Sequence, residues 1–292
     1  MRRLLRRVGI VVASLVGLAV VGYALVYGLS ERILRRTYQV PPVALSIPTD
    51  PDSIREGRRL ATVRGCFNDC HGKEVEGRVL FDDPVIARIV APNLTAAVRN
   101  YSDAQLAIII RNGVYPDGRS VIVMPAEAFS AMTDADLSLV IAFLKSLPLV
   151  SGPGPDVTVG PLGRLGVLTG KFKTGAQLIA ETVPPPAATN PEAQHGRYLA
   201  RTICAECHGA SLHGAANPDF TSPDLRVTAA YSPEAFTRLL RTGVALGERN
   251  LGAMSERARV NLSHLTDSEI AALYSYLHAM PEAAHMRRSR DH

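Results

Sequence analysis

The sequence predicts an all-α protein in which an N-terminal transmembrane helix precedes two tandem helical domains. Residues 8–29 contain no charge, and most of the chain beyond them recurs with a period of about 130–137 residues. A period this long indicates duplicated domains rather than a solenoid. We therefore divide the chain into a basic end and anchor (1–36), an extended spacer (37–52), a first repeat (53–150), a linker (151–189), a second repeat (190–283) and a tail (284–292).

The first 36 residues predict a membrane anchor. The apolar run from Val8 to Leu29 is 22 residues long, which suffices to cross a bilayer at 1.5 Å per residue. Four arginines precede it and predict a cytoplasmic N-terminus. A cleaved signal peptide is the alternative, but the run is longer than a usual signal core and no small-residue cleavage site follows. Either interpretation exports the rest of the chain.

The positive charge of the chain belongs to this anchor. Residues 1–36 carry seven arginines and one glutamate, a net +6, while the whole chain carries +5, so the remainder is net −1. No basic stripe with interleaved aromatic residues follows, which argues against nucleic acid as a partner. The spacer, with Pro41, Pro42 and Pro48, is expected to be extended. The linker contains Pro184–Pro186 and predicts no compact third domain, although residues 162–179 are apolar enough to lie against one of the repeats.

Two stretches of each repeat match without a gap. Tyr101–Val114 matches Tyr231–Val244, and Thr133–Pro148 matches Thr266–Pro281. The second pair begins with Thr-Asp, a good N-cap followed by an acidic first turn, and both members stop before a proline. Apolar residues fall at helical spacing in both, so each repeat is expected to end in an amphipathic helix.

All four cysteines lie in two related motifs. Cys204-Ala-Glu-Cys207-His208 is an unbroken C-x-x-C-H, the signature of covalent haem attachment. Thiols at this spacing share one face of a helical turn, where they can form thioethers with the two haem vinyl groups, and the following His208 is placed to ligate the iron. The first repeat has Cys66-Phe-Asn-Asp-Cys70-His71, with one extra residue between the thiols.

The extra residue leaves both thiols on one helical face, since positions four apart are also neighbours. A small bulge would therefore accommodate two thioethers, and a single thioether is the alternative. Paired cysteines also occur as half of a zinc site or as a redox dithiol. Zinc needs further ligands at short spacing, and a thioredoxin-like site needs a βαβ pattern, which is not seen.

These motifs resemble the haem sites of c-type cytochromes, and the resemblance covers roughly residues 53–148 and 190–281. It implies two class I cytochrome c domains in tandem, holding two covalently bound haem c groups. Haem attachment of this type happens outside the bacterial cytoplasm, which implies haem domains in the periplasm on an inner-membrane anchor. In this family the first and last helices of a domain cross closely at a small residue, and Gly57 and Gly196 are the matching positions.

The resemblance also implies a sixth iron ligand from the loop before the last helix. Met124, followed by Pro125, holds that place in the first repeat, and Met254 holds it in the second. Met132 and His264 are the respective rivals.

A proline carbonyl after the haem motif orients the attachment histidine in this family. Pro92 and Pro223 match by the repeat, while Pro84 and Pro218 remain alternatives.

The function implied is electron transfer between a dehydrogenase or quinol-oxidising complex and an oxidase or soluble cytochrome in a periplasmic respiratory chain. The tandem layout is also similar to the multi-haem cytochrome subunits of bacterial membrane-bound dehydrogenases, although those usually carry three motifs and this chain has two. A dihaem enzyme such as a cytochrome c peroxidase is the alternative, and would need one displaceable sixth ligand. A haem sensor or assembly subunit is a third interpretation. A sensor would be expected to carry an appended signalling domain, and none is seen in the sequence.

Overall fold

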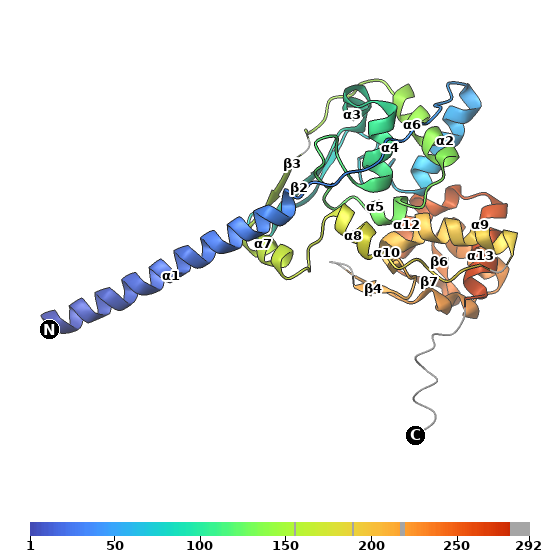
Figure 1. Cartoon of the computed structure of the whole chain (residues 1–292). Coiled ribbons are helices and arrows are strands. Elements are labelled where there is room, and N and C mark those ends of the chain that lie inside the picture. The colour runs from blue at the N-terminus through green and yellow to red at the C-terminus, as the bar shows by residue number, and fades with distance from the viewer. Residues whose placement is uncertain (155, 189, 217–219, 281–292) are drawn as a thin grey trace.

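The computed structural model describes residues 1–154, 156–188, 190–216 and 220–280. The predicted tail and the last residues of the second repeat lie outside these ranges. A long helix, α1 (Arg2–Leu34), projects from a body that contains both repeats (Figure 1). Its 33 residues extend about 50 Å, and it is the one helix among the described residues that is long and apolar enough to cross a membrane. Its apolar side chains are exposed, as expected of an anchor or a signal sequence.

Most of the chain is helical, and the helices recur in the same order in both repeats. Those of the first repeat are α2 (Pro51–Val63), α3 (Leu94–Asn100), α4 (Asp103–Asn112), α5 (Ala126–Phe129) and α6 (Asp134–Ser146). Those of the second are α9 (Pro191–Leu199), the π-helix η1 (Ala200–Cys204), α10 (Ala205–His208), η2 (Leu225–Ala230), α11 (Pro233–Thr242), η3 (Leu246–Glu248), α12 (Ala253–Val260), η4 (Leu262–His264) and α13 (Asp267–His278).

The predicted helix starts are confirmed. Thr133 caps α6 and Thr266 caps α13, each accepting a hydrogen bond from a backbone N–H in the first turn. The middle helices α4 and α11 are capped by serines and end at Gly113 and Gly243, both left-handed. The gapless sequence matches therefore correspond to matching helices with the same ends.

The expected close crossing of first and last helices is also confirmed. A Cβ on Gly57 of α2 would lie 2.0 Å from the carbonyl oxygen of Leu139 in α6, and one on Gly196 of α9 would lie 2.0 Å from that of Ala272 in α13. Since real Cβ atoms cannot approach so closely, only glycine permits these crossings.

The all-α expectation needs correction, because three small antiparallel sheets are present in the described residues. The largest pairs β1 (Arg78–Asp83) with β2 (Ala87–Ala91), and β2 with β3 (Asp156–Val159) from the linker. In the second repeat β4 (Ala215–Ala216) pairs with β5 (Thr221–Ser222), and β6 (Val244–Ala245) pairs with β7 (Arg249–Asn250).

An insertion in the first repeat explains the largest sheet. Residues 78–91 separate Gly77 from Pro92, whereas residues 215–222 separate Gly214 from Pro223, so the first repeat is six residues longer here. The longer segment has room for a hairpin, and its β-branched residues suit a strand. Its outer edge is then covered by β3, which lies about 70 positions further along the chain.

The linker is ordered against the rest of the molecule. It contains α7 (Pro161–Leu168), which packs on α1, and α8 (Gly175–Glu181), which packs on α4 and α5. The apolar stretch therefore lies against the first repeat. The spacer contains no helix before Pro51 and is docked. The N–H of Tyr38 donates to the carbonyl of Gly118 at 2.8 Å, and Val43, Leu45 and Ile47 pack against the core.

Both repeats share one hydrophobic core cluster and a polar interface. Buried Asn261 donates from Nδ2 to the carbonyl of Thr62 at 2.8 Å. Arg59 on α2 pairs with Glu269 on α13 at 2.7 Å, and the hydroxyl of Tyr198 donates to Asp136 at 2.6 Å. Since these bonds connect residues from opposite repeats, the two repeats have a defined relative position.

Candidate functional site

The attachment histidines of the two motifs have the same environment. His71 lies with its Nδ1 2.9 Å from the carbonyl oxygen of Pro92, and His208 with its Nδ1 2.8 Å from that of Pro223. A carbonyl oxygen can only accept, so each Nδ1 carries the proton and each Nε2 keeps its lone pair. That tautomer is the one an axial iron ligand needs. Both side chains are buried, and burial lowers the pKa of each histidine, which keeps the imidazoles neutral.

The structure thus forms both hydrogen bonds that the resemblance implied. Of the alternatives, Pro84 lies at the tip of the β1–β2 hairpin, where its carbonyl faces Gly160. Pro218 lies outside the described residues.

A shared loop conformation brings each histidine to its proline. Val75 and Leu212 occupy equivalent places after the motifs, and both are left-handed, with φ of 52° and 65°. Both are fully buried, and their carbonyls accept from the N–H groups of Leu94 and Leu225 at 2.8 and 2.9 Å. Left-handed backbone is costly for branched side chains. The same strained residue in both repeats therefore marks a conformation that the surrounding packing imposes.

Two residues further on, a glycine closes each loop. The N–H of Gly77 donates to the carbonyl of His71 at 2.8 Å, and that of Gly214 to the carbonyl of His208 at 3.0 Å. A Cβ on either glycine would lie 2.7 Å from a backbone oxygen of the segment that carries the proline. These glycines let the two segments approach closely enough for the histidine–proline bond.

The cysteines of the second repeat follow directly on its first helix. Helix α9 continues through the wider turn of η1 into α10, so that Cys204 and Cys207 occupy consecutive helical turns and His208 ends the helix. Each cysteine is half-buried. This continuous helical path gives the thiols the common face that the spacing predicts.

The first motif accommodates its extra residue in a loop. Helix α2 ends at Val63, after which the N–H of Cys66 donates to the carbonyl of Ala61 at 3.0 Å and that of Cys70 to Gly65 at 3.1 Å. Asn68 lies between the cysteines with φ of 66°, a conformation that asparagine tolerates better than most residues. The chain therefore bulges at Asn68, as expected.

The thiols are held as neutral groups. Burial raises the pKa of Cys66 to about 11 and the pKa values of Cys70 and Cys204 to about 12, and it also raises the pKa of Cys207. A reactive dithiol instead needs stabilised thiolates. Within the described ranges, no three His, Cys, Asp or Glu side chains gather to hold a metal ion. The donor set, with neutral thiols beside an imidazole that has its Nε2 available, fits covalently attached haem.

Met124 lies in a braced loop between α4 and α5. The preceding residue, Val123, is left-handed with φ of 72°, and the Met124 side chain packs half-buried against the core. Linker residues support this loop, because the N–H of Gly175 donates to Val121 O and that of Ala176 to Ser120 Oγ, both at 2.9 Å. The rival Met132 is fully packed in the core.

Met254 lies in the first turn of α12 and also packs half-buried against the core. The next residue, Ser255, stands where the first repeat has proline. Its hydroxyl donates to the carbonyl of Gly243 and accepts from the N–H of Leu251 at 2.8 Å. A serine therefore fixes this loop where proline stiffens the other. The rival His264 is exposed, and its carbonyl accepts from Arg59.

One arginine connects the two motifs, and sequence reasoning missed it. Arg257 on α12 forms ion pairs with Asp69 in the first motif and, at 3.3 Å, with Glu206 in the second. Both acids directly precede the second cysteine of their motif, which is the signal that could have suggested a shared partner. Burial raises the pKa of Glu206, and the charge of Arg257 opposes that rise. Because one guanidinium reaches both motifs, the two candidate haem sites are adjacent.

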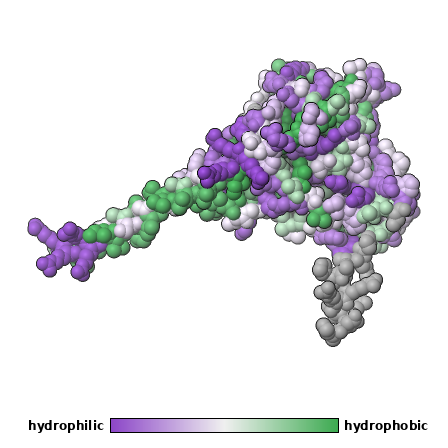
Figure 2. Space-filling view, in the orientation of Figure 1, coloured by the Kyte–Doolittle hydropathy of each residue, from purple (hydrophilic) through white to green (hydrophobic). Residues whose placement is uncertain are grey.

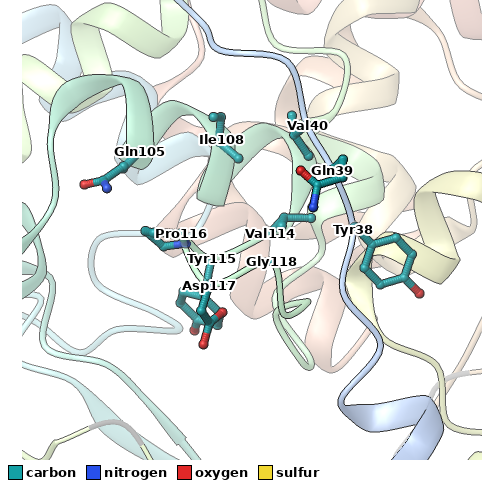
Figure 3. Close-up of a pocket in the computed structure, with 10 residues that line it drawn as sticks. All are labelled: Tyr38, Gln39, Val40, Gln105, Ile108, Val114, Tyr115, Pro116, Asp117 and Gly118. Atoms are coloured by element: carbon teal, nitrogen blue, oxygen red, sulfur yellow. The ribbon is translucent and has the colours of Figure 1, made fainter.

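A separate pocket lies at the junction of the spacer with α4 and the loop after it (Figure 3). It has a volume of about 200 Å³, and its lining includes Tyr38, Gln105 and Asp117. None of the cysteine, histidine or methionine candidates lines it, so it is not part of the candidate haem sites.

Comparison with known proteins agrees with this geometry. Residues 191–277 match a family described as Cytochrome C oxidase, cbb3-type, subunit III. The chain is 24% identical over 272 residues to the fructose dehydrogenase cytochrome subunit of Gluconobacter japonicus, a match covering 81% of this chain. The chain spans 56% of the length of that relative. It therefore contains a cytochrome c-type domain in its second repeat, which implies covalently bound haem c, and it is homologous to a fructose dehydrogenase cytochrome subunit.

Proposed function

We propose that this chain is a membrane-anchored dihaem c-type cytochrome with two cytochrome c domains in tandem. The observation that carries the proposal is the repeated histidine–proline geometry. Each repeat places a C-x-x-C-H-type histidine with its Nδ1 on a proline carbonyl, at 2.9 Å in the first and 2.8 Å in the second. The family match covers the second repeat alone. The proposal includes the first repeat because its histidine–proline loop has the same conformation as that of the second.

Each side chain has a defined role in this proposal. Cys66, Cys70, Cys204 and Cys207 would hold the two haem groups by thioether bonds, and His71 and His208 would ligate the irons through Nε2. Met124 and Met254 would supply the remaining iron ligands. Bound haem supplies a one-electron Fe(III)/Fe(II) couple, and methionine ligation raises its reduction potential. The buried loops keep the ligands in place, so that little rearrangement accompanies a change of charge.

The adjacency of the motifs supports a relay between two centres. Arg257 contacts Asp69 and Glu206 together, and α5 of the first repeat packs on η1 and α10 of the second. Electron tunnelling falls steeply with distance, so neighbouring sites favour transfer within the chain. A carrier with two adjacent centres can accept at one and deliver at the other.

The partners are proposed from the relative and from the anchor. A cytochrome subunit of a dehydrogenase is the homologue, so a dehydrogenase or a quinol-oxidising complex is the proposed donor, and an oxidase or soluble cytochrome the proposed acceptor. Helix α1 would span the bacterial inner membrane and keep the body in the periplasm near these partners. Such tethering raises the effective concentration of a carrier at its membrane partners.

An optical spectrum of the full-length chain, with haem quantified as the pyridine haemochrome, tests the proposal. We expect two haem groups per chain, a near-infrared Met–Fe(III) band that accounts for both, and no carbon monoxide binding to the reduced protein. One haem per chain would refute the two-centre relay. A high-spin fraction that binds carbon monoxide would instead indicate an open site and the peroxidase alternative.

A further inference from the structure

Helix α7 of the linker is clamped to the end of α1. The guanidinium of Arg164 donates to Ser30 Oγ at 3.0 Å, pairs with Glu31 at 2.9 Å and lies 3.7 Å from the ring centroid of Tyr27. Ser30 is fully buried by this contact, although most of α1 is exposed. A buried arginine with a carboxylate, a hydroxyl and an aromatic face as partners makes a specific joint. The position of α7 relative to α1 is therefore fixed.

The tip of the β1–β2 hairpin holds α7 from its other side. The N–H of Gly160 donates to the carbonyl of Ile86, and that of Leu162 to the carbonyl of Val85, both at 2.9 Å. A Cβ on Gly163 would lie 2.1 Å from the same Ile86 oxygen. The hairpin tip and α7 are thus in backbone contact and form one unit with the base of α1.

This unit presents four large apolar side chains to solvent. Leu162 and Leu165 are 53% and 45% exposed, one helical turn apart, while Arg164 and Val167 point into the protein. Val85 and Ile86 at the hairpin tip are 54% and 41% exposed. We call these the apolar patch: Val85, Ile86, Leu162 and Leu165. Apolar surface runs from α1 onto the body where α7 lies (Figure 2).

The patch lies at the level where α1 would leave the bilayer. The uncharged run of α1 ends at Ser30, and α7 contacts α1 from Tyr27 to Glu31. Tyrosine is typical of the membrane–water boundary. Exposed arginines follow immediately, at the level of lipid headgroups: Arg32, Arg35 and Arg36. The joint between α7 and α1 therefore lies at the predicted level of the bilayer surface.

We propose that the apolar patch inserts into the headgroup and acyl boundary of the bilayer that α1 spans. The inference rests on the proposed function of α1 as an uncleaved anchor. The patch and α1 together form a two-point attachment, which orients the body, and with it both haem motifs, relative to the membrane. Apolar side chains on a short helix beside cationic residues suit this interfacial position.

Photocrosslinking of the full-length chain in lipid nanodiscs tests this. Leu165 is replaced by p-benzoylphenylalanine, and the matched control carries the same replacement at Val227, which is 50% exposed on η2 of the second repeat. The nanodiscs contain phosphatidylcholine and phosphatidylglycerol, and lipid adducts are counted by mass spectrometry. We expect at least about fivefold more lipid adduct at position 165 than at position 227.

Equal labelling at the two positions would overturn the proposal. Irradiation in native membranes is the second arm, and an adduct there between position 165 and another protein, without lipid adduct, would also overturn it in favour of a subunit interface. Alkaline carbonate washing of the membranes distinguishes failure of the proposed anchor from failure of the proposed patch. A chain that leaves the pellet refutes both the anchor and the patch, whereas a chain that stays in the pellet without lipid labelling refutes the patch alone.

Discussion

Arg257 forms an ion pair with Asp69 across 188 residues of sequence. The arginine lies on α12 of the second repeat, and the aspartate lies between the cysteines of the first. Its guanidinium also reaches Glu206 in the other motif, and only 16% of its side chain is exposed. Gly65 lies against it, since a Cβ there would be 2.4 Å from Nη1. One partly buried positive charge therefore connects both cysteine motifs.

The change Arg257→Gln should lower both reduction potentials. It removes a positive charge beside both candidate iron sites and leaves two carboxylates unbalanced, which stabilises the oxidised state. Breaking this partly buried pair should also destabilise the fold by about 1–3 kcal/mol. Potentiometric titration and urea unfolding measure the two effects.

The control is Arg259→Gln on the same helix, where the arginine is exposed. It loses the same formal charge in a solvated position, so both effects should be smaller there. Equal shifts in potential for the two variants would mean that Arg257 acts only through net charge.

The change Gly196→Ala should destabilise the second repeat strongly. The new Cβ would overlap the carbonyl of Ala272 at 2.0 Å, so α9 and α13 must move apart. A loss of about 2–5 kcal/mol is expected for such overpacking of a helix crossing. Thermal and urea unfolding of the haem-loaded chain provide the measurement. Gly154→Ala is the control, because nothing lies within 4 Å of its Cβ position. Because Gly→Ala at an uncrowded position lowers the entropy of the unfolded chain, Gly154→Ala should not lose stability. Similar losses in both variants would show that the overlap at the crossing does not determine the result.

Replacement of Met124 by alanine should remove one near-infrared Met–Fe(III) band and lower one reduction potential, because methionine ligation favours Fe(II). Reduced protein should then bind carbon monoxide at one haem. Met132→Ala is the matched control, since Met132 is a buried core residue of the same repeat. That variant should lose about 2–5 kcal/mol of stability but keep the band. A retained band in Met124→Ala would assign the ligand elsewhere.

The same comparison applies to the second repeat with Met254→Ala. Met280→Ala is its control, because Met280 is buried just beyond the end of the last helix. We expect the near-infrared Met–Fe(III) band and one reduction potential to change in Met254→Ala but not in Met280→Ala. If carbon monoxide binds one haem of the unmodified protein, and Met254→Ala adds no second site, Met254 is not a permanent ligand.

Stability should fall at acidic pH partly through Glu269. Burial alone would raise the pKa of this carboxyl, but hydrogen bonds from Arg59 and from the N–H of Thr266 lower it below its ordinary value of 4.5. A lowered pKa in the folded state contributes stability above pH 4.5, and that contribution is lost as the pH falls through the folded-state pKa. Since Arg59 and Glu269 lie on opposite repeats, acid should weaken their interface.

Urea unfolding at several pH values from neutral to acidic tests this. Glu269→Gln should be less stable than the parent at neutral pH and should lose less stability on acidification. Glu192→Gln, at an exposed position on α9, should keep the parent pH profile. A Glu269→Gln profile parallel to the parent would show that other carboxylates govern acid unfolding.

Local patterns in the sequence determined the helical part of the architecture and the candidate ligands. Thr133 and Thr266 cap helices because a capping side chain needs only the next three residues. Gly57 and Gly196 could be predicted as crossing points because the family resemblance implies a small residue where the first and last helices of a domain cross. The bonds from His71 to Pro92 and from His208 to Pro223 followed from the resemblance and the repeat together.

Only the tertiary structure decided what depends on distant partners. The β1–β2 hairpin became part of a sheet because β3 covers its edge from the linker, and a strand of four residues carries little signal of its own. Arg257 and Arg164 act through residues more than 130 positions away, and an arginine in a sequence gives no indication of which acid it will meet. Helix caps and cysteine motifs depend on residues that are neighbours in the sequence. Ion pairs between repeats and strand pairing form only when folding brings remote segments together.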